Sequence, residues 1–222
     1  MFRNALSGVL LVLLATPAAW AQTPKVEVTG LLGWTLADGV SGDPVMASNG
    51  KMYNRVDPLD SMNFGFSVGY YLSPSVELGV LWRRQLTLLA VSGASVAKLS
   101  DINIDGYHFF GTYYVGDSKT RIRPYLLGGL GLTHYGAISY VDVDDQPKSA
   151  NGNSQFSTTW GAGVKLYATR KVGLQFGMQW TPTYIKSDAT GWWCDPYWGC
   201  FVTSNAQYSN QFEFTGGLSY RF

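Results

Sequence analysis

The sequence predicts an all-β protein that folds as one eight-stranded antiparallel transmembrane β-barrel of the up-and-down type. Three observations predict this fold. The last residues of the chain alternate between apolar and polar side chains, earlier segments repeat the alternation, and the connections between segments are short and long in turn. Side chains of a strand point alternately to its two faces, so each segment can offer one face to hydrocarbon and the other to a polar interior.

The first 21 residues have the features of a secretory signal peptide. Arg3 is followed by an apolar run from Ala5 to Ala15, and Ala19-Trp20-Ala21 forms a small-x-small site before Gln22. The alternative, a membrane anchor, needs about twenty apolar residues, and this run is too short. We therefore predict a cleaved signal peptide at 1–21 and a barrel domain at 22–222, with no cell-wall-binding domain beyond Phe222.

The composition fits a barrel and excludes several other classes. Removing the signal peptide takes Arg3 from the 16 basic residues, so 15 remain against 15 acidic ones and no polyanion or nucleic acid partner is indicated. The hydrophobic fraction is 46%, yet no later apolar run could span a membrane as a helix. The aromatic fraction of 15% is typical of barrels, which carry rings of aromatic side chains at both membrane interfaces. The 26 glycines are consistent with crowded or sharply curved strand positions.

The first four predicted strands each show a period of two. They cover Lys25–Leu36, Met62–Leu72, Val76–Thr87 and Ile102–Val115. The side chains expected to face outward are Val26, Val28, Leu32, Trp34, Phe64, Phe66, Val68, Tyr70, Leu72, Val76, Leu78, Val80, Trp82, Tyr107, Phe109, Tyr113 and Val115. A turn at Ser73-Pro74-Ser75 separates the second strand from the third, because proline fixes φ and serine bonds locally.

The other four predicted strands repeat the pattern. They cover Arg123–Tyr135, Ser157–Ala168, Val172–Thr183 and Gln211–Phe222. The side chains expected to face outward on the last three are Trp160, Val164, Leu166, Leu174, Phe176, Met178, Trp180, Phe212, Phe214, Leu218, Tyr220 and Phe222. Turns are predicted at Gly116-Asp117-Ser118-Lys119 and at Thr169-Arg170-Lys171.

The connections between the predicted strands differ in length in a regular way. Those after the second, fourth and sixth strands are short, and the others run to roughly 14 to 27 residues, as expected of periplasmic turns and extracellular loops. Both termini are then periplasmic. An even number of antiparallel strands also lets the first strand pair with the last, so that no strand edge lies unsatisfied in hydrocarbon.

Two segments resemble a known family. The final strand, which ends in Tyr220-Arg221-Phe222, resembles the C-terminal signature of small bacterial outer-membrane β-barrels of the OmpA, OmpX and OmpW kind. The run Pro124-Tyr125-Leu126-Leu127-Gly128-Gly129-Leu130-Gly131 resembles a middle strand of the same family. The resemblance implies that Tyr220 and Phe222 are the signal that the barrel-assembly machinery recognises. It also implies outer-membrane lipid and lipopolysaccharide as surroundings.

Charged side chains on the inward positions are candidates for a network in the barrel interior. They are Lys25, Glu27, Glu77, Arg83, Lys165, Glu213 and Arg221. An eight-stranded barrel is just wide enough to be filled by side chains, so we expect these groups to pair across the lumen as a structural plug. Glu27 and Arg221 should form one such pair at the periplasmic rim. The alternative is that the charges line a narrow or gated passage.

Arg84 is a candidate for contact with lipid, and His108 and His134 are candidates for catalysis. Arg84 has the outward position near the outer rim, where it could meet lipopolysaccharide phosphates as a bidentate donor or simply be solvated. A lipid-modifying enzyme would need a histidine beside a serine and an acid. We expect Thr158 and Trp160 beside His134, and His108 lies between aromatic neighbours. The family's lipid A deacylases have a His-x-Ser pattern that this sequence lacks, so no catalytic residue is assigned.

The fourth long connection has the most distinctive composition. It contains Cys194 and Cys200, the only cysteines, which we predict to form a disulfide because the chain passes through an oxidising compartment. Five aromatic residues there could form a contact surface or fold down onto the barrel mouth: Trp192, Trp193, Tyr197, Trp198 and Phe201. Exposed apolar clusters usually mark a contact surface.

No cofactor or metal site is predicted. The glycines at 128–131 lie within a strand and open no helix, so they lack the context of a phosphate-binding loop. Asp142, Asp144 and Asp145 could hold calcium weakly, but such a cluster is more often a solvated loop tip.

Taken together, the sequence predicts an outer-membrane protein with a structural barrel and with loops that bind an extracellular ligand or adhere to a surface. The alternatives are an OmpW-like passage for small hydrophobic molecules and a lipid-modifying enzyme.

Overall fold

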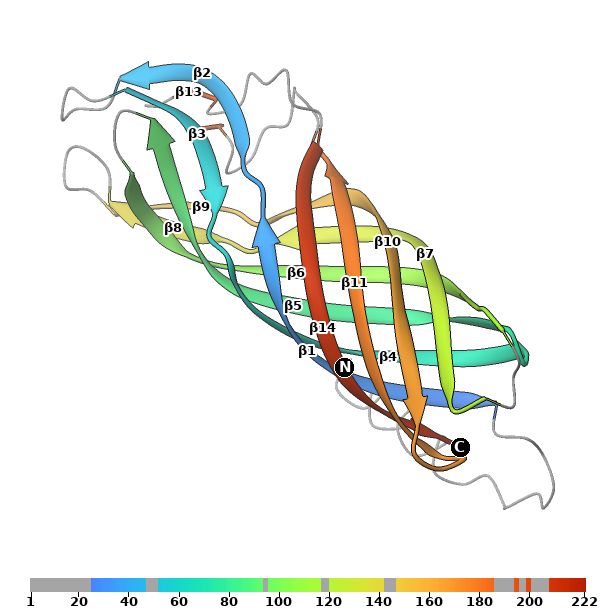
Figure 1. Ribbon diagram of the computed structural model, residues 1–222. Helices are drawn as coiled ribbons and strands as arrows, with labels where there is room; N and C mark the ends of the chain where they lie inside the picture. Colours follow the sequence, from blue (N-terminus) through green and yellow to red (C-terminus); the bar gives the residue numbers. More distant parts are fainter. Residues whose placement is uncertain are drawn as a thin grey trace, which may run out of the picture.

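A computed structural model describes residues 25–46, 52–93, 96–116, 120–141, 147–185, 194–195, 199–200 and 208–222 (Figure 1). The predicted signal peptide, 1–21, lies outside these residues. Every regular element in the described ranges is a β-strand. Within them, no helix is long and apolar enough to cross a membrane.

Eight strands form the wall of a closed antiparallel barrel, which confirms the predicted fold class. They are β1 (Val26–Ala37), β4 (Ser61–Ser73), β5 (Val76–Gly93), β6 (Ala97–Tyr114), β7 (Ile122–Tyr135), β10 (Asn153–Tyr167), β11 (Val172–Tyr184) and β14 (Tyr208–Arg221). Each pairs with the next one in this order, and β14 returns to β1. The chain therefore winds around the barrel without a crossover (Figure 1).

The pairing of the first and last wall strands closes the barrel. Their register runs from Glu27 opposite Arg221 to Ala37 opposite Gln211, and the Phe222 amide donates to the Val26 carbonyl over 2.8 Å. Closure satisfies the backbone groups of both strands, which hydrocarbon could not do. The start of β1 and the end of β14 thus lie at one rim of the barrel. The short connections after β4, β6 and β10 lie at the same rim.

The alternation of each wall strand separates a lipid-facing surface from a polar interior. Aromatic and aliphatic side chains at the predicted outward positions are exposed, among them Leu32, Phe109 and Phe176. Threonine, glutamine and serine on the opposite face are buried, as at Thr159 and Gln179. The exposed apolar side chains form a band around the barrel, as a membrane-spanning surface requires.

The strands β5 and β6 are longer than predicted, with 18 residues each. The sequence predicted a loop over residues 88–101, but β5 continues to Gly93 and β6 begins at Ala97. The run Leu88-Leu89-Ala90-Val91 does not alternate, and the pairing shifts register between Leu89 and Ala90. Leu89 and Val91 pack in the upper interior of the barrel, and Ala90 between them is buried as well, so the period of two that revealed the other strands is lost.

Three of the long connections also contain short strands that the sequence did not predict. They are β2 (Val40–Met46) and β3 (Met52–Pro58) in the first, β8 (Ile138–Val141) and β9 (Pro147–Ala150) in the third, and β12 (Cys194–Asp195) and β13 (Gly199–Cys200) in the fourth. Strand β3 pairs with the upper part of β5, so β2, β3, β5 and β6 form a sheet that rises beyond the membrane band at the upper left of Figure 1.

Candidate functional site in the barrel lumen

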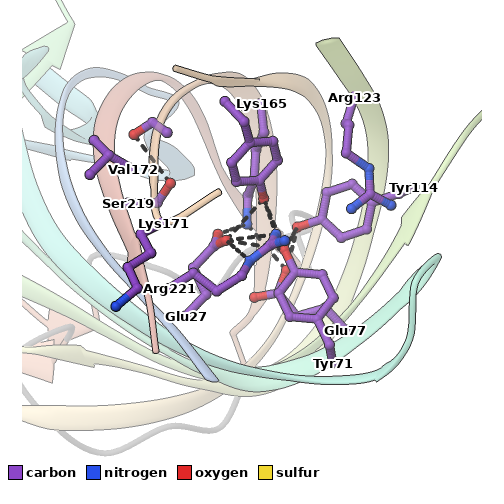
Figure 2. A network of polar contacts seen from close by, with 12 residues as sticks. Glu27, Tyr71, Glu77, Tyr114, Arg123, Lys165, Lys171, Val172, Ser219 and Arg221 are labelled. Carbon is purple, nitrogen blue, oxygen red and sulfur yellow. Dashed lines mark hydrogen bonds and ion pairs between the residues drawn. The ribbon is translucent and has the colours of Figure 1, made fainter. Parts of the chain in front are cut away.

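The interior of the barrel at the periplasmic rim holds a group of charges, here called the periplasmic charge cluster: Glu27, Glu77, Lys165 and Arg221. Lys165 Nζ lies 2.5 Å from Glu27 Oε1 and 3.2 Å from Glu77 Oε2. Arg221 Nη2 lies 3.0 Å from Glu27 Oε2. The four side chains come from β1, β5, β10 and β14, and Figure 2 shows their polar atoms turned toward one another. Two acids and two bases therefore balance across the lumen.

Three tyrosines complete this cluster. The hydroxyl of Tyr167 donates to Glu27 Oε2 over 2.9 Å. Tyr114 donates to Glu77 Oε2, and the Tyr71 and Tyr114 hydroxyls lie 3.0 Å apart (Figure 2). The Arg221 guanidinium lies over the Tyr71 ring, 4.3 Å from its centroid. The buried carboxylates thus receive hydrogen bonds in addition to their ion pairs, which a buried charge requires.

A glycine makes room for the second carboxylate of the cluster. Gly69 lies opposite Gly79 on β5, and a Cβ built on Gly69 would lie on the Glu77 carboxyl group. Any larger residue at this position would displace Glu77 from Lys165. The glycine on this strand is therefore required by the close approach of a side chain, and not by an unusual backbone angle.

A second group of charges crosses the middle of the barrel, here called the central ion pair. Arg83 on β5 contacts Glu213 on β14, and both side chains are almost completely buried. Arg83 also donates to Gln179 Oε1 over 2.8 Å and to Thr181 Oγ1 over 3.0 Å. This pair ties one side of the barrel wall to the other.

Two apolar layers alternate with the two charged groups. The lower apolar layer contains Leu31, Leu81, Phe110, Tyr125 and Leu127. The upper apolar layer contains Val40, Tyr53, Val56, Leu89, Val91, Ile102, Ile104, Tyr135, Ile138 and Ile185. Strand β5 contributes inward side chains to each charged group and each apolar layer in turn. Among them are Glu77 in the periplasmic charge cluster, Leu81 in the lower apolar layer, Arg83 in the central ion pair and Leu89 in the upper apolar layer. The lumen is thus a stratified core.

Two cavities that described residues line within this core are very small. One lies beside the central ion pair and one beside the lower apolar layer, and each offers about 10 Å³ to the centre of a water-sized sphere. That is about the space of a single water molecule. The interior is consequently filled by side chains, as expected for eight strands.

A row of polar side chains lies on the outer surface just above the apolar band: Arg84, Asp105, His134 and Ser154, here called the outer polar row. They are successive register partners on β5, β6, β7 and β10. Leu132 and Phe156, one step below on β7 and β10, are exposed apolar partners. The row therefore lies at the edge of the lipid-facing surface.

The structure gives Arg84 a partner that the sequence did not indicate. Its Nε and Nη2 donate to the two carboxylate oxygens of Asp105, both over 2.8 Å. The Nε and Nη2 face of the guanidinium is thus engaged by a neighbour on the same surface. The sequence missed this partner because Asp105 becomes adjacent only through the register of β5 and β6.

The surroundings predicted for His134 are also wrong. Its register partner on β10 is Ser154, not Thr158 or Trp160, and His134 Nδ1 lies 2.8 Å from Ser154 Oγ. Its partner on β6 is an acid, Asp105, which the sequence did not indicate. Asp105 gives both oxygens to Arg84, and the His134 ring leans over Gly152 on the opposite side. A serine and a histidine are in contact here, but the acid that would orient the histidine is engaged elsewhere.

The comparisons with known proteins decide the family. The profile of the family described as outer membrane protein β-barrel domain matches residues 7–222. The chain belongs to this family. A comparison with curated protein sequences gives no significant match. The protein is therefore an outer-membrane β-barrel, located in the outer membrane.

Solved structures of small outer-membrane barrels are similar to this one. OprG from Pseudomonas aeruginosa has a TM-score of 0.59 and 13% identity, over 90% of this chain and 97% of OprG. Neisserial surface protein A has a TM-score of 0.56 and 15% identity, over 89% of this chain and 97% of that protein. AlkL in lipid bilayers has a TM-score of 0.52 and 15% identity, over 93% and 95% of the two chains. Identities this low show a shared fold alone.

Several side chains of this outer-membrane barrel have different surroundings from those expected. Lys25 was predicted to face inward, but it is exposed at the rim, because it precedes the first residue of β1. Arg123, which was assigned no face, is buried and donates to the Pro74 carbonyl, with its guanidinium 4.4 Å from the centroid of the Tyr114 ring. The tyrosines of the periplasmic charge cluster were not predicted either. Their inward positions follow from the alternation, but a neutral hydroxyl gives no sign in the sequence that it joins an ion network.

Some predicted sites lie partly or wholly outside the described residues. Asp142, Asp144 and Asp145 are outside them, as are the aromatic residues Trp192, Trp193, Tyr197, Trp198 and Phe201. Within the described ranges, no group of three or more histidine, cysteine or acidic residues could hold a metal ion. For the cysteines the backbone is described, and β12 and β13 place Cys194 directly opposite Cys200. The disulfide stays a prediction.

Proposed function

We propose that this outer-membrane barrel does not conduct and acts through its extracellular face, as a binding or adhesion protein. The observation that carries the proposal is the stratified lumen. A solute moving along the axis would have to separate the periplasmic charge cluster and the central ion pair, and to push aside both apolar layers. Separating a buried ion pair costs several kcal/mol for each ion left alone. The barrel then serves as the anchor, and the extracellular region makes the contacts.

The length of the extracellular strands supports this proposal. A membrane-spanning strand needs about 9–11 residues. The strands β5 and β6 have 18 each, so a large portion of both lies beyond the membrane and is paired there with β3. The upper apolar layer packs on the inner side of this sheet. The sheet has its own core, and can hold a contact surface in a fixed position.

Two measurements test the proposal together. Purified protein in planar bilayers should give no discrete conductance steps, and cells that display it should bind immobilised extracellular-matrix proteins or glycans more strongly than cells without it. A variant in which residues 191–201 are replaced by a glycine-serine linker should keep the barrel and lose binding. Steady single-channel conductance in the wild type would contradict the proposal that the barrel does not conduct. Unchanged binding by the linker variant would show that residues 191–201 do not make the extracellular contact.

A passage for small hydrophobic molecules is the second candidate. The upper apolar layer favours it, because an extracellular compartment of this kind could receive a hydrophobic solute. The central ion pair directly below opposes transport along the axis. Uptake of a hydrophobic fluorescent dye into cells with and without the protein separates the two candidates, since a binding protein would leave the uptake rate unchanged.

The predicted disulfide gives a test of the extracellular contact surface. Replacing Cys194 and Cys200 together by serine should leave the heat-modifiable mobility of the barrel unchanged and weaken binding. The bridge would close a short loop, so its stabilisation is at most about 3 kcal/mol and acts on the loop. The backbone register is compatible with it, because directly opposed residues of an antiparallel pair lie at a Cα distance that a disulfide can span. Two free thiols in the unreduced protein would disprove the bridge.

The C-terminal residue gives a test of assembly. Phe222 is 65% exposed on the lipid-facing side, and its ring packs edge-on against Tyr220 at 4.8 Å between centroids. We propose that these two rings are what the barrel-assembly machinery binds. Deleting Phe222 should leave the protein in the periplasm, as seen by membrane fractionation. Leu218→Ala, which also removes an exposed apolar side chain of β14, is the matched control and should insert normally.

A further inference from the structure

The cavity beside the central ion pair lies where four wall strands face one another across the lumen. Its lining includes Asn63 on β4, Arg83 on β5, His108 on β6 and Glu213 on β14. All four side chains are between 1% and 5% exposed. The cavity offers about 10 Å³ to the centre of a water-sized sphere. It is thus enclosed, polar and large enough for one small molecule.

Each of these four residues has a buried polar atom that makes no hydrogen bond to any described residue. The atoms are Asn63 Oδ1, Arg83 Nε, His108 Nδ1 and Glu213 Oε2. Glu213 Oε2 contacts Arg83 Nη1 as an ion pair and keeps further lone-pair capacity. Buried polar groups without a partner typically cost about 1–3 kcal/mol each, so three such atoms around one cavity, beside a carboxylate oxygen with spare lone pairs, point to a ligand that bonds to all four.

The hydrogen-bond roles of two of these atoms follow from their neighbours. Asn63 Nδ2 donates to Thr35 Oγ1 over 2.7 Å, which leaves the amide oxygen as the acceptor on the cavity side. Arg83 uses Nη1 and Nη2 on Gln179 and Thr181, and its buried Nε–H is a donor that no described residue accepts. The cavity therefore receives at least one acceptor and one donor.

A chain of hydroxyl groups favours one tautomer of His108. Thr183 Oγ1 donates to Thr133 Oγ1 over 3.1 Å, and Thr133 Oγ1 donates to Ser157 Oγ over 2.9 Å. Ser157 then has its own proton available for His108 Nε2, which lies 2.9 Å away. An imidazole that accepts at Nε2 carries its proton on Nδ1. His108 thus presents a second donor to the cavity.

We propose that this cavity binds one water molecule as a fixed component of the plug. Water accepts from Arg83 Nε–H and His108 Nδ1–H, and it donates to Asn63 Oδ1 and Glu213 Oε2. Two donors and two acceptors match its four hydrogen bonds. A bound anion would face the Glu213 carboxylate and the Asn63 oxygen, and a cation would face Arg83, so neither fits the complete set. The water links β4, β5, β6 and β14 at the level where the central ion pair closes the lumen.

Gly106 offers a substitution that fills this cavity without disturbing the backbone. A Cβ at Gly106 would lie 3.3 Å from His108 Cε1, 3.5 Å from Nδ1 and 3.9 Å from Arg83 Nη2, all of them side-chain atoms. Gly111 on the same strand is a matched control. A Cβ there would lie 3.3 Å from Leu78 Cδ2, on the lipid-facing surface. Both Gly→Ala changes alter strand β6 alike, but only Gly106→Ala places a methyl group in the cavity.

The test is a high-resolution crystal structure of the wild type, of Gly106→Ala and of Gly111→Ala, grown with sodium bromide. The wild type and Gly111→Ala should show one solvent peak within about 3.2 Å of the four atoms, without anomalous signal. Gly106→Ala should lose the peak, and its urea midpoint should fall below that of Gly111→Ala. A wild type without the peak, an anomalous bromide peak at the site, or a peak retained in Gly106→Ala would each overturn the proposal.

Discussion

Replacing Lys165 by methionine is expected to lower the free energy of unfolding by about 3–5 kcal/mol, because it leaves buried carboxylates without their shared partner. Lys165 is the residue of the periplasmic charge cluster that contacts both acids, at 2.5 Å from Glu27 and 3.2 Å from Glu77. Without it, Glu77 keeps the hydrogen bond from the Tyr114 hydroxyl but has no cation of the cluster in contact. Urea unfolding of the barrel in lipid vesicles, followed by tryptophan fluorescence and gel mobility, measures the loss.

Two further variants show whether unpaired charge is the cause. Lys165→Met with Glu77→Gln removes one base and one acid, so Glu27 and Arg221 remain as a balanced pair and most of the stability should return. Arg221→Met is the milder single change. Its side chain is 16% exposed at the rim, and Glu27 keeps Lys165 when Arg221 is removed. Arg221→Met as damaging as Lys165→Met, or no recovery in the double variant, would argue against this account.

The same observation bears on a double-mutant cycle of Glu27 and Arg221, which the sequence predicted to pair. The two residues do pair, but Glu27 has two cationic partners. Removing Glu27 and Arg221 together therefore leaves Lys165 with Glu77, a balanced pair, while removing Glu27 alone leaves two bases against one acid. The coupling energy is the difference between the stability loss of the double variant and the sum of the two single losses. We expect it to arise mainly because the variant that lacks only Glu27 is strongly destabilised.

The second large effect is expected at the central ion pair. Arg83→Met should cost about 3–5 kcal/mol, because Glu213 is left almost completely buried without its cation. Arg83→Met with Glu213→Leu should cost much less, since neither charge remains and the apolar side chains occupy a similar volume. A double-mutant cycle in urea measures the coupling. Additive losses from the two single variants would show that the pair is not the unit of stability.

A conductance measurement on the same variants connects stability to closure. If the central ion pair closes the lumen, the Arg83→Met and Glu213→Leu double variant should still not conduct, because apolar side chains would take the place of the charges between two apolar layers. A conducting double variant would mean that charge, and not packing, closes the barrel. This outcome would favour transport of small hydrophobic molecules over extracellular binding as the function of the protein.

The alternation of side chains was enough to predict the wall of the barrel. Lipid on one side and a polar interior on the other impose a period of two on every membrane-spanning segment, so all eight wall strands and most of their inward charges could be located without a structure. Lys25, which is exposed, and Arg123, which is buried, were the exceptions. The two faces of β14 and the lipid-facing position of Phe222 were predicted in this way. The family followed from the same strand.

Strands beyond the membrane could not be predicted by the same argument. Above the apolar band, β5 and β6 have water outside and the upper apolar layer inside, so residues such as Leu89 and Ile102 point inward and the lipid-facing pattern stops. Strand β3 pairs with this upper part of β5, and β2 pairs with β3, so both were missed for the same physical reason.

The partners of the polar side chains were decided by tertiary structure alone. Alternation assigns a side chain to a face, but the register between strands decides which groups lie opposite one another. A shift of two residues keeps every face and changes every partner. That is why Arg84 could be placed near the rim without revealing Asp105, and His134 without Ser154. It is also why a cavity that joins Asn63, Arg83, His108 and Glu213 forms only when four strands from distant stretches of the chain close into a barrel.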